Sequence, residues 1–403
     1  MALAAAVKEG GIYMNTKKIL LILGMAGFVV MADNWVVSPI LPSISKDIGV
    51  NVASAALIIT AYMIPFGLFQ LIFGYLADKF GKRQVISFAM VFFTVATGLC
   101  AIGMGLTDLA IYRALTGIFA ASVMPISLAL IGDIFPLNER QSAIGTFMGI
   151  SFLGQGLSMA IGGSIAYFLN WRGVFAVYAV LSVISTILLL TIGKNIPSTK
   201  NENSKVFAPY ISLLKNPSSL RIYILVLFEG IFLLGSFSFL GGFIKNMYAF
   251  NNFVIGMIMT AFGIMAVIGG RVSGKISAKI GRKKTILLGL TSAVLANLIF
   301  VTLGHVLVIL IIGVGLLGLG FMLAHSTFLT IATEFAAKAR GVAMSLVAFC
   351  FMGGGGLGTA IGSRIAGSSF ITLFAIYGAG LVALIFAVFM VKKSFVIQNV
   401  QQK

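Results

Sequence analysis

Four ionisable residues lie inside long apolar stretches of the sequence: Asp33, Arg113, Glu229 and His325. A charge at the centre of a membrane helix costs about 3 kcal/mol, so such residues mark ion or substrate pathways. A carboxylate that holds a proton cannot also hold a cation, and this competition would couple the movement of the two. We therefore expect proton coupling at these four positions, with Asp33 first because it lies deeper in its stretch than Glu229. Each carboxylate could instead hydrogen-bond a neighbouring helix, and His325 could be a packing residue.

The apolar stretches that must position these residues are long enough to cross a membrane as helices. Of the 403 residues, 59% are hydrophobic and only 9% are charged, whereas a soluble domain has about 25% charged residues. A helix of about 20 apolar residues satisfies its own backbone groups across the hydrocarbon layer. We predict an all-α integral membrane protein with twelve transmembrane helices, at 19–42, 52–76, 85–105, 108–132, 141–168, 173–193, 221–244, 253–274, 285–304, 306–332, 341–367 and 369–391.

An internal repeat with an offset of 200 residues divides the chain into two halves. Gly74 and Gly81 recur as Gly274 and Gly281, and the same shift takes Arg140 to Arg340. Since six helices separate the copies, both halves keep one orientation and are related by a pseudo-twofold axis along the membrane normal. We predict an N-terminal six-helix bundle at 1–193, a polar cytoplasmic linker at 194–220 and a C-terminal six-helix bundle at 221–403.

The charge distribution predicts the orientation in the membrane. The net charge is +18, from 28 basic and 10 acidic residues, but the charges form short clusters between apolar stretches. Membrane topology explains these clusters better than nucleic-acid binding does. With a cytoplasmic N-terminus, the basic residues on the outer side of the membrane or near the outer ends of the helices are only Lys46, Arg172, Lys245 and Arg364. We therefore expect a multi-pass protein of the cell (inner or plasma) membrane with both termini in the cytoplasm.

The sequence contains no pattern that we can assign to a cofactor, a metal or a catalytic site. Cys100 and Cys350 lie in separate apolar segments, without metal-ligand neighbours and without an expected disulfide. The segment from Gly269 to Lys275 reads as the start of a P-loop, but Ile276 stands where a Ser or Thr is required. We expect that the protein is not an enzyme and draws energy from an ion gradient or from its substrate's own gradient.

A basic turn with one carboxylate follows the second predicted helix, from Gly74 to Arg83. Its glycines permit unusual backbone angles, and Asp78 could stabilise the N-terminus of a neighbouring helix. This segment resembles the GxLaDrxGrk loop of the major facilitator superfamily, and the resemblance covers essentially the whole chain. It implies a conformational gate in which the loop packs near Gly341, and the gate residues that we expect are Gly74, Asp78, Gly81, Arg83, Arg140 and Arg340.

Two further segments resemble the twelve-span drug:H⁺ antiporter branch of that superfamily. Arg113, Gly117 and Ala121 are similar to its RxxxGxxxA pattern, which implies proton transfer at Arg113. An arginine that snorkels to the membrane interface would fit the same position. The fifth predicted helix follows the spacing of the antiporter glycine motif, but Ser158 and Met159 replace its central Gly-Pro, which argues against antiport. The resemblance also implies a central cavity across which Asp33 and Glu229 face each other.

Stripes of aromatic and polar residues at helical spacing are the candidate substrate-binding residues. They suit an amphipathic or aromatic solute, although helix packing explains them equally well. The candidates are Tyr62, Phe66 and Gln70 in the second predicted helix, Phe232, Ser236 and Phe239 in the seventh, and Gln155 in the fifth.

We expect a secondary transporter that exports a small amphipathic or cationic compound in exchange for protons, as multidrug-resistance antiporters do. A transporter of a sugar, an organic acid or a lipid-like metabolite is the nearest alternative. A membrane-embedded enzyme or a sensor is the alternative of a different class. The expected partners are the small-molecule substrate, protons and the lipid bilayer, with no nucleic acid, and the expected state is a monomer.

Overall fold

The computed structural model describes residues 16–198, 208–335 and 340–391, and these residues are almost entirely helical. Twelve helical segments among them are long and apolar enough to cross a membrane, which confirms the predicted fold class. The first half contains α2 (Thr16–Trp35), α3 (Val37–Asp47), α4 (Val52–Ala55), α5 (Leu57–Phe80), α6 (Lys82–Ala101), α7 (Leu106–Ala120), α8 (Val123–Ile134), α9 (Leu137–Phe168) and α10 (Trp171–Thr191).

The seventh transmembrane segment begins at Pro217, within the stretch that we predicted as linker. A short 3₁₀ segment η1 (Gly193–Asn195) and an amphipathic helix α11 (Ala208–Lys215) occupy part of the stretch that we expected to be a plain polar linker. The second half then contains α12 (Pro217–Glu229), the π-helical segment η2 (Gly230–Leu234), α13 (Gly235–Tyr248), α14 (Asn252–Ile280), α15 (Arg282–Thr302), α16 (Leu307–Glu334), α17 (Arg340–Ala366) and α18 (Phe370–Met390).

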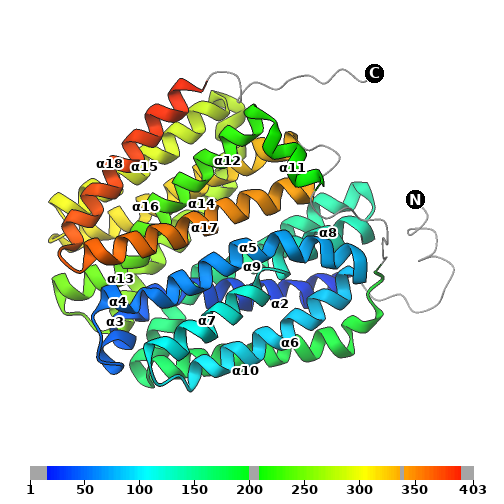
Figure 1. The fold of residues 1–403 in the computed structure, drawn as a ribbon, viewed down its shortest axis with the longest axis horizontal. Helices are drawn as coiled ribbons and strands as arrows, with labels where there is room; N and C mark the ends of the chain where they lie inside the picture. Colours follow the sequence, from blue (N-terminus) through cyan, green and yellow to red (C-terminus); the bar gives the residue numbers. More distant parts are fainter. Residues whose placement is uncertain (1–15, 199–207, 336–339, 392–403) are drawn as a thin grey trace.

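The two halves lie side by side, with α2–α10 below and α12–α18 above in Figure 1. Helix α5 packs along α17, and α9 packs along α14, so these two pairs form most of the contact between the halves. The end of the bundle with α11 and the end of α8 lies at the right of Figure 1, and we name it the linker end. The end with α3, α4 and the last turns of α13 is the opposite end.

Helix boundaries follow from local backbone chemistry that recurs in the two halves. Gly81 has φ +99° and Gly281 has φ +86°, a region that residues with a side chain rarely adopt. These two glycines end α5 and α14, and so the sequence repeat is also a structural repeat. At the opposite end, Asn51 and Asn251 each accept a hydrogen bond from a backbone N–H three residues later, at 2.7 and 3.0 Å, and so cap the helices that follow.

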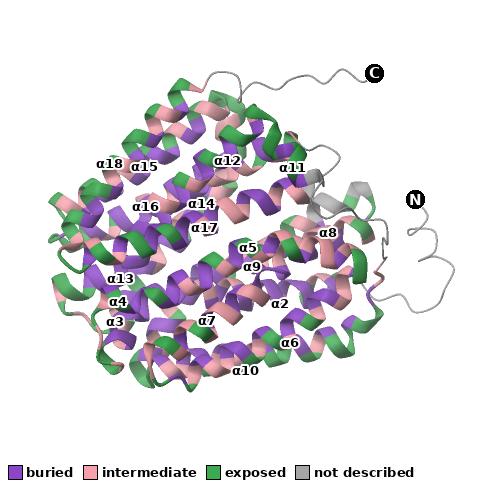
Figure 2. Cartoon of the chain, in the orientation of Figure 1, coloured by how far each residue is buried: buried purple, intermediate pink, exposed green. Residues whose placement is uncertain are grey.

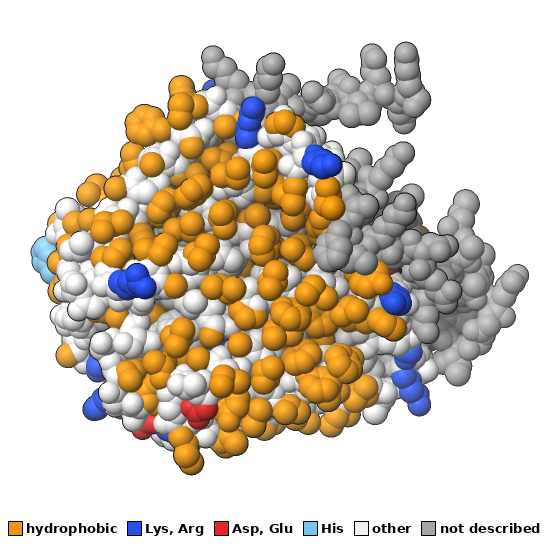
Figure 3. Space-filling model, in the orientation of Figure 1, with side chains coloured by type: hydrophobic (Ala, Val, Ile, Leu, Met, Phe, Trp, Pro, Cys, Tyr) orange, Lys and Arg blue, Asp and Glu red, His pale blue; other side chains and the backbone are white. Residues whose placement is uncertain are grey.

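The distribution of side chains agrees with a lipid-facing exterior. Buried residues follow the helix faces that lie inside the bundle, as Figure 2 shows. Hydrophobic side chains cover the middle of the face in Figure 3, and most charged side chains on that face lie near its margins. An apolar surface of this extent on that face suits hydrocarbon as its solvent.

Candidate functional site

A cavity of about 780 Å³ lies between the two halves. Helices α2, α5, α8 and α9 line it from the first half, and α14, α16 and α17 line it from the second. It extends towards the linker end, where Gly145, Arg271 and Met344 form part of its wall. A volume of this size suits one drug-sized molecule.

An aromatic cluster joins the halves, and its members Trp35, Phe321 and Phe351 line this cavity. The Trp35 ring of α2 lies 4.9 Å from Phe237, 5.3 Å from Phe262 and 5.7 Å from Phe321, measured between ring centroids. Phe321 in turn stacks on Phe351 at 5.3 Å, with an interplanar angle of 7°. The cluster therefore offers flat apolar surfaces to a ligand.

The halves are in close contact at the opposite end. The Ser38 hydroxyl donates to the Phe237 carbonyl oxygen at 2.8 Å, and the Ser43 hydroxyl donates to Asn252 Oδ1, also at 2.8 Å. Gly241 lies so near α3 that a Cβ there would be 2.1 Å from the Ser38 carbonyl oxygen. Any larger residue would push the halves apart, so these contacts close the opposite end while the cavity reaches towards the linker end.

Glu229 and His325 form an acid–base pair at the edge of the cavity. His325 Nδ1 lies 3.2 Å from Glu229 Oε2. Glu229 is fully buried and its Oε1 has no hydrogen-bond partner among the described residues. The His325 ring packs on Phe351 at 4.0 Å between centroids, keeps 17% of its side chain exposed and lines the cavity. Of this pair, His325 therefore contacts the cavity and Glu229 lies behind it.

Asp33 and Arg113 form a second acid–base pair, which is buried away from the cavity. Arg113 Nη1 donates to Asp33 Oδ2 at 2.6 Å, and the two side chains are 1% and 0% exposed. The Tyr62 ring covers the guanidinium, with 4.3 Å from Cζ to the ring centroid. Gly117 lets α7 approach α5 closely enough for this contact, because a Cβ at Gly117 would lie 2.3 Å from the Tyr62 carbonyl oxygen.

The structure pairs each carboxylate with a base of its own half, instead of placing the two carboxylates face to face. Asp33 is followed by Asn34 and Trp35, which do line the cavity, whereas Asp33 does not. Its Oδ1, the Arg113 Nε and the Tyr62 hydroxyl all have no hydrogen-bond partner in the described part of the chain. The Asp33–Arg113 pair is therefore one layer behind the cavity wall.

The predicted substrate-binding residues separate into two groups. Phe66, Gln70 and Gln155 line the cavity, whereas Tyr62 packs on Arg113. The residues expected on the seventh transmembrane helix, Phe232, Ser236 and Phe239, do not line the cavity.

The Ser236 hydroxyl donates to Asn297 Oδ1 at 2.9 Å. The Phe232 and Tyr377 ring centroids are 6.1 Å apart, and Phe239 is fully buried. The π-helical segment η2 separates Glu229 from most of this stripe. An i→i+5 segment shifts the register, so the regular spacing that we assumed does not hold there.

Sequence reasoning missed several lining residues. Trp35 and Arg271 were not among the expected site residues. The methionines of the wall were not expected either. Methionine is flexible and polarisable, so it adapts to ligands of different shape. The methionines that line the cavity are Met31, Met124, Met148, Met322, Met344 and Met352.

The predicted gate residues lie at the linker end. The Lys82 ammonium lies 2.7 Å from Asp133 Oδ2 and 3.7 Å from Asp78 Oδ1, so it links the start of α6 to the ends of α8 and α5. Arg83 donates through Nη1 to the Lys194 carbonyl oxygen. Gly74 lies beside the Tyr210 hydroxyl of α11. The side chains of Arg140 and Arg340 lie outside the described residues.

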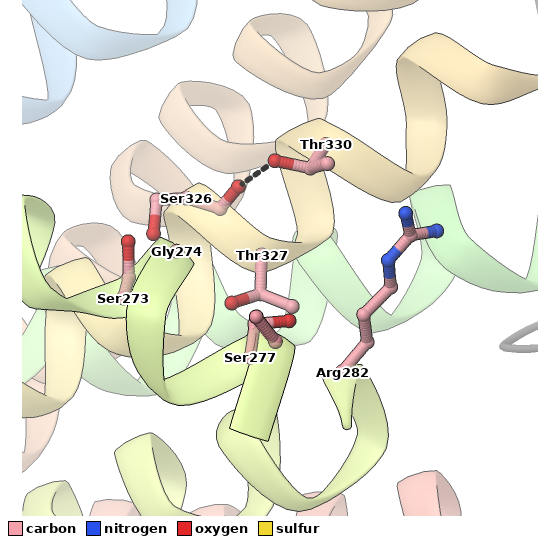
Figure 4. A pocket seen from close by; sticks show the side chains of 8 residues that line it. Ser273, Gly274, Ser277, Arg282, Ser326, Thr327 and Thr330 are labelled. Atoms are coloured by element: carbon pink, nitrogen blue, oxygen red, sulfur yellow. Dashed lines mark hydrogen bonds between the residues drawn. The ribbon is translucent and has the colours of Figure 1, made fainter. Parts of the chain in front are cut away.

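A smaller pocket of about 290 Å³ lies between α14 and α16 at the linker end, and Figure 4 shows its lining. Ser326 lines both this pocket and the central cavity. The Ser273, Ser326, Thr327 and Thr330 hydroxyls donate to backbone carbonyl oxygens of their own helices, which leaves them as acceptors. Arg282 donates to both carboxylate oxygens of Glu334, so its charge is already neutralised.

Comparison with known proteins identifies relatives over the whole chain. The sequence model of the Major Facilitator Superfamily matches residues 23–359 and 231–398. The uncharacterized MFS-type transporter YceJ of Bacillus subtilis is 30% identical over 270 residues, which are 65% of this chain and 67% of the relative. A putative metabolite transport protein of Haemophilus influenzae is 26% identical over 402 residues, which are 94% of each chain.

One drug-resistance relative is matched over part of its length. The multidrug transporter protein MdtP of Bacillus subtilis is 33% identical over 184 residues, which are 45% of this chain and 33% of the relative. The chain thus spans about a third of that relative. Among solved structures, the nucleoside transporter NupG has a TM-score of 0.76 and 16% sequence identity, and the match covers 93% of this chain and 99% of NupG.

Proposed function

Because the chain belongs to the Major Facilitator Superfamily, and is a transporter and not an enzyme, we propose that it exports a small amphipathic compound in exchange for protons. The observation that carries this proposal is the Glu229–His325 pair, which touches a drug-sized cavity between two halves that are closed at the opposite end. The proposed mechanism is alternating access, in which the halves rock about the cavity.

The proposed orientation puts the linker end in the cytoplasm and the protein in the cell membrane as a monomer. The basic residues near the linker end, such as Lys82, Arg83 and Lys283, support this orientation. In that orientation the structure represents an inward-facing state, in which substrate enters the cavity from the cytoplasm.

The coupling that we propose uses the His325 ring as the group that meets the proton. When the cavity opens outwards, a proton from outside enters the Glu229–His325 pair as substrate leaves. When the cavity opens inwards, the proton leaves to the cytoplasm and new substrate binds. Asp33 and Arg113 have a different proposed role: their buried pair holds α2 against α7 and α5, so that the first half moves as one body.

A second candidate function is transport of a metabolite without proton exchange. The absence of the Gly-Pro from the fifth transmembrane helix favours it, because Ser158 stands there and donates to the Gln155 carbonyl oxygen at 3.0 Å within a continuous helix. The similarity to the putative metabolite transport protein of Haemophilus influenzae over 94% of both chains also favours it.

Uptake into proteoliposomes, with and without a pH gradient, distinguishes these two functions. A panel of amphipathic compounds should accumulate only with the gradient, and Glu229→Gln should lose this accumulation while still exchanging substrate downhill. Uptake by both proteins that is independent of the pH gradient, and that only equilibrates the compound across the membrane, would instead support the second candidate.

The orientation is tested separately by labelling introduced cysteines in intact cells. With Cys100 and Cys350 replaced by alanine, an impermeant reagent should label Lys245→Cys and should not label Lys194→Cys. Labelling of Lys194→Cys in sealed cells would contradict the proposed orientation. The linker residue Lys200, which the sequence also places inside, lies outside the described residues.

A further inference from the structure

The ionisable residues that line the central cavity are both bases. Among the described residues of its wall, only Arg271 and His325 can carry a charge. The two fully buried acids, Asp33 and Glu229, are 0% exposed and do not line the cavity, and each has a base as its partner. A cationic substrate that enters from the linker end would therefore meet no accessible carboxylate in this state, in contrast to what we expected from the sequence.

Arg271 has no hydrogen-bond or ion-pair partner among the residues that the structure describes. By contrast, Arg282 is held by Glu334 and Arg172 is held by Asp47. Arg271 is exposed and lies in the cavity wall towards the linker end. A guanidinium presents a planar set of N–H donors that matches a carboxylate, sulfonate or phosphate.

Gln155 provides an unsatisfied donor at the wall of the same cavity. Its side chain is 3% exposed, and its Nε2 has no hydrogen-bond partner in the described structure. A buried amide donor without a partner is costly, and a ligand with acceptor atoms would satisfy it. The ring nitrogen of His325 that does not face Glu229 is a further polar atom in this wall.

We propose that the transported compound is an amphipathic organic anion. Its apolar body lies against Trp35, Phe66, Phe321 and Phe351, and its anionic group is attracted by Arg271 and hydrogen-bonded by Gln155. This assignment rests on the proposed export function, whose substrate class it names. It is consistent with export, because a membrane potential that is negative inside drives an anion outwards.

The test compares three ligands that share one apolar body: naphthylacetate, naphthylethylammonium and naphthylethanol. Binding to the full-length protein is measured from the fluorescence of Trp35 in a Trp171→Phe background, since the chain has only 2 tryptophans. We expect naphthylacetate to bind about tenfold more tightly than naphthylethylammonium, as one charge-assisted hydrogen bond would give. Equal or tighter binding of the ammonium compound would overturn the proposal, and so would the absence of saturable binding of naphthylacetate.

Variants of Arg271 locate the effect. Arg271→Gln should weaken the binding of naphthylacetate about tenfold and leave naphthylethanol unchanged, and Arg271→Lys should retain most of the preference for the anion. The control is Lys275→Gln, which removes one positive charge a helical turn away, outside the cavity wall. Equal losses in Arg271→Gln and Lys275→Gln would overturn the assignment, because they would indicate a general surface field.

Failure of the coupling is distinguishable from failure of this inference. If naphthylacetate binds with the expected preference but a pH gradient does not drive its transport, the proton exchange is wrong and the anion assignment is supported. If a pH gradient drives transport of the ammonium compound in preference to the anion, the export function stands and this inference is wrong.

Discussion

At the scale of single residues, the two buried acid–base pairs differ in what remains when the acid is removed. Arginine stays protonated in proteins, whereas histidine can become neutral. Removing one partner of a buried ion pair leaves the other charge unpaired, which costs about 3–5 kcal/mol. The Asp33 and Arg113 side chains are 0% and 1% exposed, so removing Asp33 would leave a buried, unpaired charge on Arg113. Removing the Glu229 charge need not leave an unpaired charge, because histidine can become neutral.

Asp33→Asn should therefore lower the melting temperature and the folded yield clearly, because Arg113 loses its counterion. Glu229→Gln should melt close to the wild type, because neutral His325 can still hydrogen-bond the amide. Melting of purified protein in nanodiscs measures both effects. The double variant Asp33→Asn/Arg113→Gln should recover much of the stability that Asp33→Asn alone loses.

A wild-type melting temperature for Asp33→Asn would contradict the structural role of the pair. Asp33 would then again be the first candidate for proton coupling, as its depth in the apolar stretch indicates. The geometry favours Glu229 and His325 for that role instead, because His325 reaches the cavity and Asp33 does not.

At the scale of elements, the turn between α5 and α6 bears on the equilibrium between the two states. Asp78 contacts Lys82 at 3.7 Å and its side chain is 45% exposed, so Asp78→Asn should change stability by less than about 1 kcal/mol. In the outward-facing state we expect Asp78 to approach the start of α17, where a carboxylate favours the helix N-terminus. Asp78→Asn should thus shift the protein towards the inward-facing state and slow transport.

Distances between spin labels at Lys79→Cys and Lys279→Cys, one in each half, measure that shift. The matched control is Asp133→Asn, which removes the other partner of Lys82, a contact within the first half that the proposed gate does not use. An unchanged distance distribution in Asp78→Asn, or an equal change in Asp133→Asn, would contradict the proposed gate.

The helix α11 in the linker has a docking contact that should depend on pH. The Tyr210 hydroxyl donates to the Leu71 carbonyl oxygen of α5 at 3.2 Å. Burial raises the pKa of the Tyr210 phenol above its ordinary value of 10.0, a hydrogen bond with Ser345 lowers it, and the Asp78 carboxylate raises it. Because the undocked phenol ionises at a lower pH than the docked one, docking keeps its full strength below pH 10 and weakens as the pH rises through the docked-state pKa.

A fluorophore on Leu214→Cys, whose native side chain is 41% exposed, should report release of α11 above about pH 10. Tyr210→Phe should start with weaker docking but should show little further change at alkaline pH. An alkaline transition of the same size in both proteins would show that other groups control it.

At the scale of the whole molecule, the proposed alternating access requires the two halves to separate at the opposite end. The Ser43 and Asn252 side chains meet there at 2.8 Å, one from each half. A disulfide between Ser43→Cys and Asn252→Cys should therefore hold the inward-facing state and abolish transport, and a reductant should restore it. Uptake into proteoliposomes before and after reduction measures this, in a background without Cys100 and Cys350.

The single variant Ser43→Cys is the control and should transport under both conditions. Full transport by the oxidised double variant, with the disulfide verified by mass, would show that the halves need not separate at this point.

Sequence alone indicated twelve segments long and apolar enough to cross a membrane, and a repeat between the two parts of the chain. These properties depend on the length and apolarity of each segment and on the matching of residues such as Gly81 and Gly281, and both are local. The four intramembrane ionisable residues were identifiable for the same reason, since a charge in an apolar stretch is conspicuous wherever the helix points. Three of the candidate substrate-binding residues, Phe66, Gln70 and Gln155, line the cavity.

Only the tertiary structure decided which groups meet. In a membrane helix, the lipid-facing side and the side packed on other helices are both apolar, so periodicity does not reveal how the helix is rotated. That is why Phe232 and Phe66 look equivalent in the sequence although only Phe66 lines the cavity. Partners 80 residues apart, Asp33 and Arg113, and 96 residues apart, Glu229 and His325, are brought together by packing between helices. The same packing puts bases and not acids in the cavity wall, because it turns both carboxylates towards their partners within the halves.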